Sequence, residues 1–340
     1  MKKVIVESHV PFVADALRGH AVVESVPPEA ITPAVVRDAD AVVVRTRTRC
    51  DAALLEGSRV SIVATATIGT DHIDREWCAA HGIAVASAPG CNAPAVAQWV
   101  MGAMRQVRST KYEVQSTNNE QRKTVGVVGV GHVGSIVARW AADLGMDVLL
   151  CDPPRARREG DDGFVTFDEV LERADVITLH VPLSHTGADA TRHLINRETL
   201  ARARRCRLLL NAARGAVCDT AALLEAPSSL ALAIDCWEDE PRLSLPLLER
   251  AMVATPHIAG YSLEGKQRGA AMVLEALETH FGLNLDIAWP DVPATGIEHL
   301  TWDALGYDPL ADTAALKSQP AAFETLRNTY TLRHEPHLFY

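Results

Sequence analysis

A glycine-rich turn, Gly129-Val130-Gly131-His132-Val133-Gly134, constrains the fold of this chain more than any other feature. It follows the apolar run Val125–Val128 and opens a helix-like pattern that continues to Leu144. In this context Gly129 permits a tight turn, Gly131 lets the backbone approach a pyrophosphate, and Gly134 allows a helix to pack closely on a strand. The pattern therefore predicts a Rossmann-type nucleotide-binding domain.

The residues around the turn indicate which nucleotide it takes. A second strand-like run ends directly before Asp152, whose carboxylate suits the ribose hydroxyls and repels the extra phosphate of NADP. The helix that starts at His132 and Val133 directs free N–H groups towards phosphates. We therefore expect NAD as the cofactor, held by the three glycines, His132, Val133 and Asp152. Three nearby arginines are interpreted as a solvated loop, with a 2′-phosphate site as the alternative: Arg155, Arg157 and Arg158.

Short apolar runs alternate with helix-like segments along two stretches of the chain. The runs are Val4–Val6, Ala41–Val44, Val60–Ala64 and Ile83–Ala86 in the first stretch, and Val125–Val130, Asp147–Cys151, Asp175–His180, Arg207–Asn211, Leu230–Ile234 and Met252–Ala254 in the second. Apolar runs without alternation are typical of parallel strands that are covered on both faces. We therefore expect an α/β protein with two doubly wound parallel sheets.

The segments that join and follow the two stretches are less regular. The join falls at Ala88–Asn92, and a helix-like segment, Ala93–Val107, and a polar stretch, Ser109–Lys123, follow it. Residues 284–320 are rich in Pro, Asp and Ala, with one further helix predicted within Phe323–Leu332. We interpret 284–340 as a small appended domain or interface arm.

Charge and cysteine content narrow the classes of partner and compartment. The formal net charge of −10 argues against nucleic acid or an anionic membrane as a bulk partner. No apolar stretch approaches the length of a membrane span. The seven cysteines form no C-x-x-C pair, which is typical of reduced, buried thiols in a cytoplasmic protein. No metal site is predicted.

Three chemically distinct residues follow three of the predicted strands. Arg214 follows Arg207–Asn211, Glu240 lies beyond Leu230–Ile234, and His257 follows the last run. The carboxyl ends of parallel strands share one crevice, so the three side chains should converge there. An Arg can hold a carboxylate, a His can take a hydroxyl proton, and a Glu can orient that His. Taken singly, each would be an ordinary loop residue; together they predict oxidation or reduction at C2 of a 2-hydroxy or 2-oxo acid.

Several segments make the chain resemble the D-isomer-specific 2-hydroxyacid dehydrogenases. They are Gly129–Gly134, His180-Val181-Pro182-Leu183, Asn211–Gly215, Asp235–Pro241 and Pro256-His257. The sequences of further loops, above all His257–Lys266, most resemble those of the subfamily that oxidises 4-phospho-D-erythronate in pyridoxal 5′-phosphate biosynthesis. The resemblance implies a flavodoxin-like substrate domain (1–93 and 259–283), a Rossmann NAD domain (94–258) and a C-terminal dimerisation domain (284–340) that makes a homodimer.

The resemblance also implies particular contacts. The matching cofactor-binding positions are Asp152, Ala212, Ala213, Arg214, Asp235, His257 and Gly260, and the matching substrate positions are Thr46, Thr67 and Tyr261. Asp235 has the alternative interpretation of a structural carboxylate at a strand end. Two departures stand out: Val181 occupies the place of a Thr that touches the cofactor, and Gln98 that of a Glu.

The phosphate of such a substrate would need cations. Arg45, Arg47 and Arg49 alternate along the chain, so an extended segment would carry them on one face. We expect Arg45 or Arg47 to contact the substrate and Arg49 to lie on the surface. Other hydroxy acids (3-phosphoglycerate, glyoxylate or hydroxypyruvate) remain alternative substrates, and an NAD-binding regulator without turnover is the alternative function.

Overall fold

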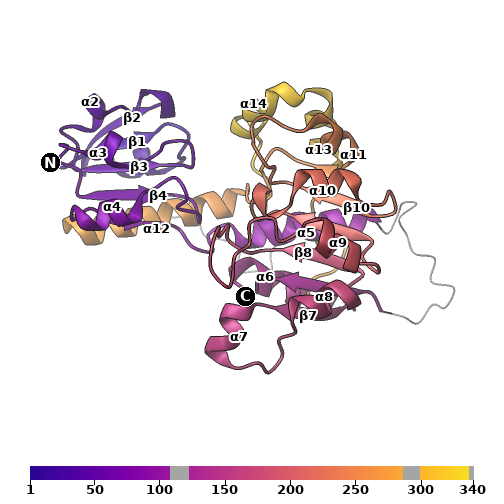
Figure 1. Ribbon diagram of the computed structural model, residues 1–340. Helices are drawn as coiled ribbons and strands as arrows, with labels where there is room; N and C mark the ends of the chain where they lie inside the picture. The colour runs from indigo at the N-terminus through magenta and orange to yellow at the C-terminus, as the bar shows by residue number, and fades with distance from the viewer. Residues whose placement is uncertain (108–121, 286–298, 337–340) are drawn as a thin grey trace. The chain divides into compact units, whose positions relative to one another are not determined.

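The computed structural model describes residues 1–107, 122–285 and 299–336 (Figure 1). Most of the predicted polar stretch Ser109–Lys123 therefore lies outside the described residues, as do residues 286–298 of the segment interpreted as an appended domain. The chain divides into two compact units, one of residues 1–92 and 262–294, the other of residues 93–261 and 295–340. Each unit is described by itself.

The first unit contains a five-stranded parallel sheet in the order β2-β1-β3-β4-β5. Its strands are β1 (Lys3–Glu7), β2 (Val22–Val26), β3 (Ala41–Val44), β4 (Ile62–Thr65) and β5 (Ala84–Ala86). Its helices are α1 (Val13–Ala16), α2 (Pro33–Val36), α3 (Ala52–Leu55), α4 (Arg75–Ala80) and α12 (Leu263–Phe281), with a 3₁₀ turn at Pro28–Ala30. This strand order is that of the flavodoxin-like fold.

Both faces of this first sheet are covered. On one face, Val273, Leu274 and Leu277 of α12 pack with Val4 and Val6 of β1. The opposite face is packed by a second apolar cluster: Ile5, Val42, Val44 and Val63 of the sheet with Leu54, Leu55 and Cys78 of α3 and α4. Helix α12 is far away in sequence, so the chain returns to its first unit to complete that core (Figure 1).

The second unit contains a six-stranded parallel sheet in the order β11-β10-β9-β8-β6-β7. Its strands are β6 (Thr124–Val128), β7 (Asp147–Cys151), β8 (Val176–Leu179), β9 (Leu208–Asn211), β10 (Ala231–Ile234) and β11 (Val253–Ala254). An isolated parallel bridge between Leu150 and Phe164 continues the sheet beyond β7. Counted with that bridge, the order is the doubly wound one of dinucleotide-binding folds, and the predicted fold class is confirmed.

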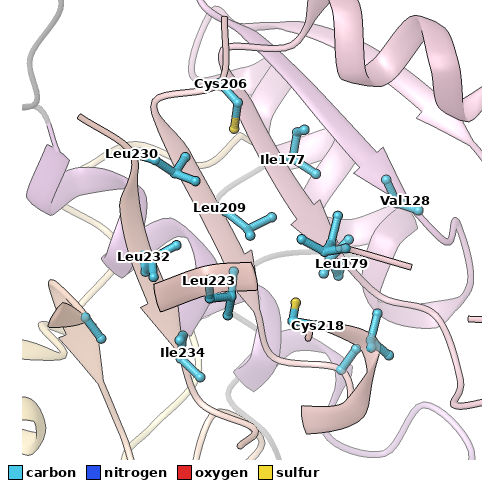
Figure 2. Packing of buried hydrophobic residues seen from close by; sticks show 14 of the residues in the cluster. Val128, Ile177, Leu179, Cys206, Leu209, Cys218, Leu223, Leu230, Leu232 and Ile234 are labelled. Atoms are coloured by element: carbon cyan, nitrogen blue, oxygen red, sulfur yellow. The ribbon is translucent and has the colours of Figure 1, made fainter. Parts of the chain in front are cut away.

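Helices cover both faces of the second sheet. The helices of this unit are α5 (Ala93–Val107), α6 (His132–Asp143), α8 (Phe167–Arg173), α9 (Arg197–Arg202), α10 (Thr220–Glu225), α11 (Leu245–Arg250), α13 (Leu310–Ser318) and α14 (Phe323–Asn328), with 3₁₀ turns at Gly215–Val217 and Pro320–Ala322. A further helix, α7 (Pro153–Glu159), contains no buried residue. Figure 2 shows part of one covered face, where Ile177, Leu209 and Leu232 of neighbouring strands meet Leu223 of α10. The opposite face packs against α5 and α6.

The C-terminal residues contribute to both of these cores. Leu300 and Leu305 belong to the cluster with α5 and α6, while Leu316 and Phe323 belong to the cluster of Figure 2. Leu316 and Phe323 are completely or almost completely buried, which is worth about 2 kcal/mol each in removal of apolar surface from water. The segment is thereby anchored to the second unit. The division into three domains stays a prediction.

None of the helices in the described ranges is both long enough and apolar enough to cross a membrane.

Candidate active site

The glycine-rich turn lies between the carboxyl end of β6 and the start of α6, and each glycine has a different neighbourhood. A Cβ on Gly129, which has a φ of +88°, would lie 2.7 Å from the carbonyl of His180, and one on Gly134 would lie 2.0 Å from the oxygen of Gly129. A Cβ on Gly131 would meet nothing within 4 Å. Gly129 and Gly134 are therefore required by packing, whereas Gly131 is required only if something else approaches it. The space beside Gly131, at the N-terminus of a helix, suits a pyrophosphate.

Asp152 directly follows the neighbouring strand β7 and is hydrogen-bonded to the same turn. Its Oδ2 accepts from the Val130 N–H at 2.8 Å, and its Oδ1 accepts from the Arg155 N–H at 3.0 Å at the start of α7. A carboxylate has about four lone-pair sites, so it retains acceptors for a ribose. The residues present thus fit a dinucleotide.

The three arginines near Asp152 are paired with protein groups. Arg155 Nε contacts Glu159 at 2.6 Å, Arg158 contacts the same carboxylate at 2.9 Å, and Arg157 pairs with Asp189. Arg155 also donates to the carbonyl of Val130 at 2.8 Å. These contacts favour a surface role over a 2′-phosphate site.

His132, exposed, and Val133, half-buried, begin α6 directly after the open glycine. Val181 follows β8, and its N–H lies 2.9 Å from where a Cβ on Gly129 would stand. Its side chain is half-buried against the core cluster of Figure 2. Burial lowers the pKa of the preceding His180 to about 3, so this imidazole is neutral at physiological pH.

Arg214 is held by the loop that follows β9. Asn211 Nδ2 donates to the Arg214 carbonyl at 2.9 Å, and Arg214 Nη1 donates to the Ala213 carbonyl at 2.8 Å. A Cβ on Gly215 would lie 2.0 Å from the backbone of Trp237. Only glycine lets the loops after β9 and β10 touch through their backbones. The Arg214 loop and the loop that carries Glu240 are thereby brought together; Ala213 is buried and Ala212 half-buried beside them.

His257 and Glu240 form a direct pair. The Nδ1 of His257 lies 2.6 Å from Oε1 of Glu240, whose Oε2 accepts from the Trp237 N–H at 3.2 Å. Burial would raise the pKa of Glu240, but the charge and hydrogen bond of His257, aided by Arg327, hold it at about 2. Glu240 is therefore an ionised acceptor, so the imidazole donates from Nδ1 and presents Nε2 for chemistry.

Asp235 organises the backbone on either side of His257. Its carboxylate is buried and accepts from Thr255 Oγ1 at 2.6 Å, from the Ile258 N–H at 2.8 Å and from the Ala259 N–H at 3.0 Å. Burial raises its pKa against the opposing influence of His257. These contacts favour the structural interpretation of Asp235. His257 itself has a φ of +56°, a conformation that costs about 1–2 kcal/mol for a residue with a side chain and so needs such support.

The remaining predicted residues of this unit lie just beyond that loop. Gly260 and Tyr261 are half-buried, and the ring of Tyr261 lies edge-on to that of Tyr330 with centroids 6.1 Å apart. Arg327 is buried, and its charge acts on Glu240 and Tyr261. Nothing in the local sequence around Arg327 distinguishes it from other arginines, so its role could not be predicted.

The predicted substrate residues of the first unit do not form the expected basic face. The chain turns after Val44, so Arg45 is buried with its Nε 3.3 Å from Glu7, whereas Arg47 is exposed. The prediction of three arginines on one extended face is wrong, because the buried Glu7 draws Arg45 inwards. Arg49 is exposed and pairs with Asp51 at 2.7 Å, as its surface interpretation requires.

The two threonines predicted to contact substrate are half-buried. Thr46 lies in the turn that follows β3. Thr67 Oγ1 is 2.7 Å from Thr65 Oγ1 and 3.3 Å from the carbonyl of Gly69.

Within the described ranges, one group of side chains has the spacing of a metal site: His193, Asp219 and Glu238. Protein contacts already engage it. His193 Nε2 lies 2.7 Å from Glu238, which also accepts from the Thr220 N–H, and Asp219 accepts from the Ala221 N–H at the start of α10. We interpret the group as a hydrogen-bonded link between loops.

Comparison with known proteins places this geometry in context. Residues 93–259 match the model of the D-isomer specific 2-hydroxyacid dehydrogenase, NAD binding domain. Erythronate-4-phosphate dehydrogenase of Bacteroides fragilis is 43% identical, covering 98% of this chain and 97% of the relative. The Porphyromonas gingivalis protein of the same name is 41% identical over 96% of this chain and 92% of the relative.

Solved structures of similar proteins share the fold of this chain. A Thermus thermophilus protein has a TM-score of 0.69 and 28% identity, covering 84% of this chain and 98% of its own. D-lactate dehydrogenase of Aquifex aeolicus, complexed with NAD and lactic acid, has a TM-score of 0.65 and 25% identity, covering 83% and 96%. Because near full-length relatives and the domain model both match, the chain belongs to the D-isomer-specific 2-hydroxyacid dehydrogenase family.

Proposed function

We propose that this chain oxidises the C2 hydroxyl of 4-phospho-D-erythronate to give 3-hydroxy-2-oxo-4-phosphobutanoate, with NAD as acceptor, in pyridoxal 5′-phosphate biosynthesis. The observation that carries the chemistry is the 2.6 Å contact between His257 and an ionised Glu240. The substrate is supported by relatives named erythronate-4-phosphate dehydrogenase, which are 39–43% identical over nearly the whole chain.

His257 is the proposed base. With Nδ1 donating to Glu240, Nε2 takes the proton of the C2 hydroxyl, and the carboxylate stabilises the imidazolium that results. NAD, when bound, supplies the acceptor for the hydride that leaves C2. In the reverse direction, His257 returns the proton to the oxygen of the 2-oxo acid.

Arg214 is the proposed cation for the substrate carboxylate and the C2 oxygen. Its planar guanidinium can form two parallel hydrogen bonds and stabilise the negative charge that develops on that oxygen during hydride transfer. The further substrate contacts that we propose are Arg45, Thr46, Arg47, Thr67 and Tyr261. Of the two arginines, Arg47 is the stronger candidate for the phosphate, because its side chain is exposed whereas that of Arg45 is buried.

The proposed cofactor contacts are those of the second unit: Gly129, Gly131, His132, Val133, Gly134, Asp152, Val181, Ala212, Ala213, Arg214, Asp235, His257 and Gly260. The open approach at Gly131 and the carboxylate of Asp152 support NAD. Asp235 would act indirectly, by holding the loop that contains Gly260.

The test is formation of NADH by purified protein with NAD and 4-phospho-D-erythronate, with a 2-oxo acid added in parallel to recycle the cofactor. We expect turnover well above that with D-glycerate, D-lactate or 3-phosphoglycerate. Preference for one of those acids would overturn the substrate assignment. NAD binding without turnover of any of them would overturn the enzymatic assignment in favour of a regulator.

We further propose a homodimer formed through residues 284–340 and a cytoplasmic location. The first rests on the family resemblance; the second is supported by the seven cysteines, all of them buried free thiols. Light scattering should give twice the chain mass of 36.7 kDa, and a monomer mass would contradict the dimer. Recovery of the protein in the membrane fraction of its cell would contradict the location.

A further inference from the structure

Arg333, close to the C-terminus, contacts the backbone that directly follows His257. Its Nη1 donates to the carbonyls of Ile258 and Tyr261, both at 3.1 Å, and its Nη2 donates to that of Ala259. Three carbonyls within four residues are thus held by one guanidinium. Hydrogen bonds from a charged donor are roughly twice as strong as those from a neutral donor.

The guanidinium is itself fixed by its surroundings. Its Nε donates to Gln98 Oε1 at 2.9 Å, and Nη2 also donates to the Ala95 carbonyl at 3.0 Å, so α5 holds one edge. The ring of Tyr307 lies 4.2 Å from the guanidinium carbon, and Tyr330 OH accepts from Nη1 at 3.3 Å. Planar stacking and several fixed acceptors restrict the side chain to one position, which a flexible ammonium would not reproduce.

Asp235 binds the N–H groups of the same loop whose carbonyl groups bind Arg333. The carboxylate accepts from the N–H groups of Ile258 and Ala259, and Arg333 donates to the carbonyls of those two residues. The two charged side chains therefore specify the orientation of consecutive peptide planes. This is the segment that keeps His257 at its positive φ.

A second arginine of the C-terminal segment acts on the partner of His257. Arg327 of α14 is buried, and its charge helps keep Glu240 ionised and interacts with Tyr261. Both members of the pair, His257 and Glu240, thus depend on arginines that lie at least 70 residues further along the chain.

We propose that Arg333 is a positioning residue for the dehydrogenase reaction, which holds the backbone after His257 so that Nε2 faces the substrate hydroxyl. The C-terminal residues 310–336 are thereby part of the active site as well as of the fold. This inference rests on the proposed function for its kinetic consequence, but its structural consequence can be measured without turnover.

The kinetic experiment compares Arg333→Met and Arg333→Lys with the wild type. Methionine keeps the apolar stem but removes every donor, and lysine restores the charge without the planar fork. We expect kcat to fall at least about 10-fold in Arg333→Met and less in Arg333→Lys, because displacement of a reacting group by about 1 Å costs up to 100-fold. The Kd for NAD should change by a smaller factor than kcat, since the glycine turn and Asp152 are untouched and only the proposed contacts of His257 and Gly260 lie at this loop. The control Arg173→Met removes an exposed arginine paired with Glu169 on α8 and should leave kcat unchanged.

The second measurement is amide hydrogen exchange in the absence of substrate. Exchange at Ile258 and Ala259 should accelerate at least about 10-fold in Arg333→Met, with exchange in β6 unchanged. If Arg333→Met does not fold, Tyr330→Phe, which removes one contact to Arg333, should show the same effects at smaller size. A folded variant with normal kcat and normal exchange at 258–259 overturns the inference. Faster exchange there, combined with a wild type that turns over no hydroxy acid, would overturn the proposed function and leave the loop-holding role of Arg333 intact.

Discussion

The imidazole of His257 and the carboxylate of Glu240 meet at 2.6 Å although they come from the loops after two different strands. Each partner is held separately: Glu240 by the Trp237 N–H, and the backbone around His257 by Asp235. The two loops are therefore held independently, and the contact with Glu240 sets the orientation of the imidazole. The pair is in place before any substrate arrives, which is the condition for an oriented base.

The glycine turn offers a prediction that separates binding from folding. Gly131→Ala should unfold at the same temperature as the wild type, because its Cβ meets nothing within 4 Å, yet it should bind NAD at least about 10-fold more weakly because that methyl group occupies the space of the pyrophosphate. Calorimetric titration with NAD and thermal unfolding measure the two quantities.

Gly134→Ala is the matched variant for that prediction. Its Cβ would lie 2.0 Å from the Gly129 oxygen, so we expect it to lose several kcal/mol of stability, on the order of the largest single-residue effects. A Gly131→Ala protein that binds NAD normally would remove the turn from the cofactor site.

Glu240 should contribute stability that depends on pH. Its pKa is lowered from 4.5 to about 2 in the folded chain, so the ionised form stabilises the fold fully above pH 4.5, and this stabilisation is lost as the pH falls towards 2. The shift corresponds to roughly 3 kcal/mol as an upper bound. The pKa of Asp235 is raised, so its contribution to stability has the opposite dependence on pH. The free energy of unfolding of the wild type, plotted against pH, therefore contains both contributions.

Comparison of the wild type with Glu240→Gln isolates the Glu240 contribution. The difference in free energy of unfolding, from urea titrations at several pH values, should be largest near pH 6 and should shrink towards pH 3. A difference that stays constant over this range would show that the carboxylate charge does not stabilise the fold.

Gln98 departs from the family pattern, but its side-chain amide both donates and accepts hydrogen bonds in its buried site. Its Nε2 donates to the carbonyls of Leu305 at 2.7 Å and His334 at 3.0 Å, while its Oε1 accepts from Arg333. Gln98→Glu would place a carboxylate oxygen against two carbonyls and should cost about 1–3 kcal/mol. Thermal unfolding measures this loss. The same change at the exposed Gln319 should stay within about 0.5 kcal/mol, and equal effects at the two positions would contradict the hydrogen-bond assignment.

Most of the strands could be predicted because apolar runs mark buried parallel strands. The strand β2 was missed because it lies at a sheet edge, where Glu24 and Ser25 interrupt the apolar run and most side chains are exposed. Similarly, the predicted helix within Phe323–Leu332 ends at Asn328. Local patterns are weak wherever burial is incomplete.

The pairing of His257 with Glu240 was expected because both residues follow strands whose ends converge. The roles of Arg45 and Arg333 could not be predicted in this way. Arg45 turns to a buried Glu7 from another strand, and Arg333 contacts a loop about 75 residues earlier in the chain. Such contacts depend on tertiary packing and leave no periodicity or spacing in the sequence.

The role of His257 as the base is tested by the kcat of His257→Gln with NAD and 4-phospho-D-erythronate, measured together with the Kd for NAD. Glutamine retains a polar side chain but cannot take the hydroxyl proton. We expect kcat to fall by about 10²–10⁴-fold, the usual contribution of a general base, while the Kd for NAD changes by a much smaller factor. A His257→Gln protein that turns over within a few-fold of the wild type would contradict the assignment of His257 as the base.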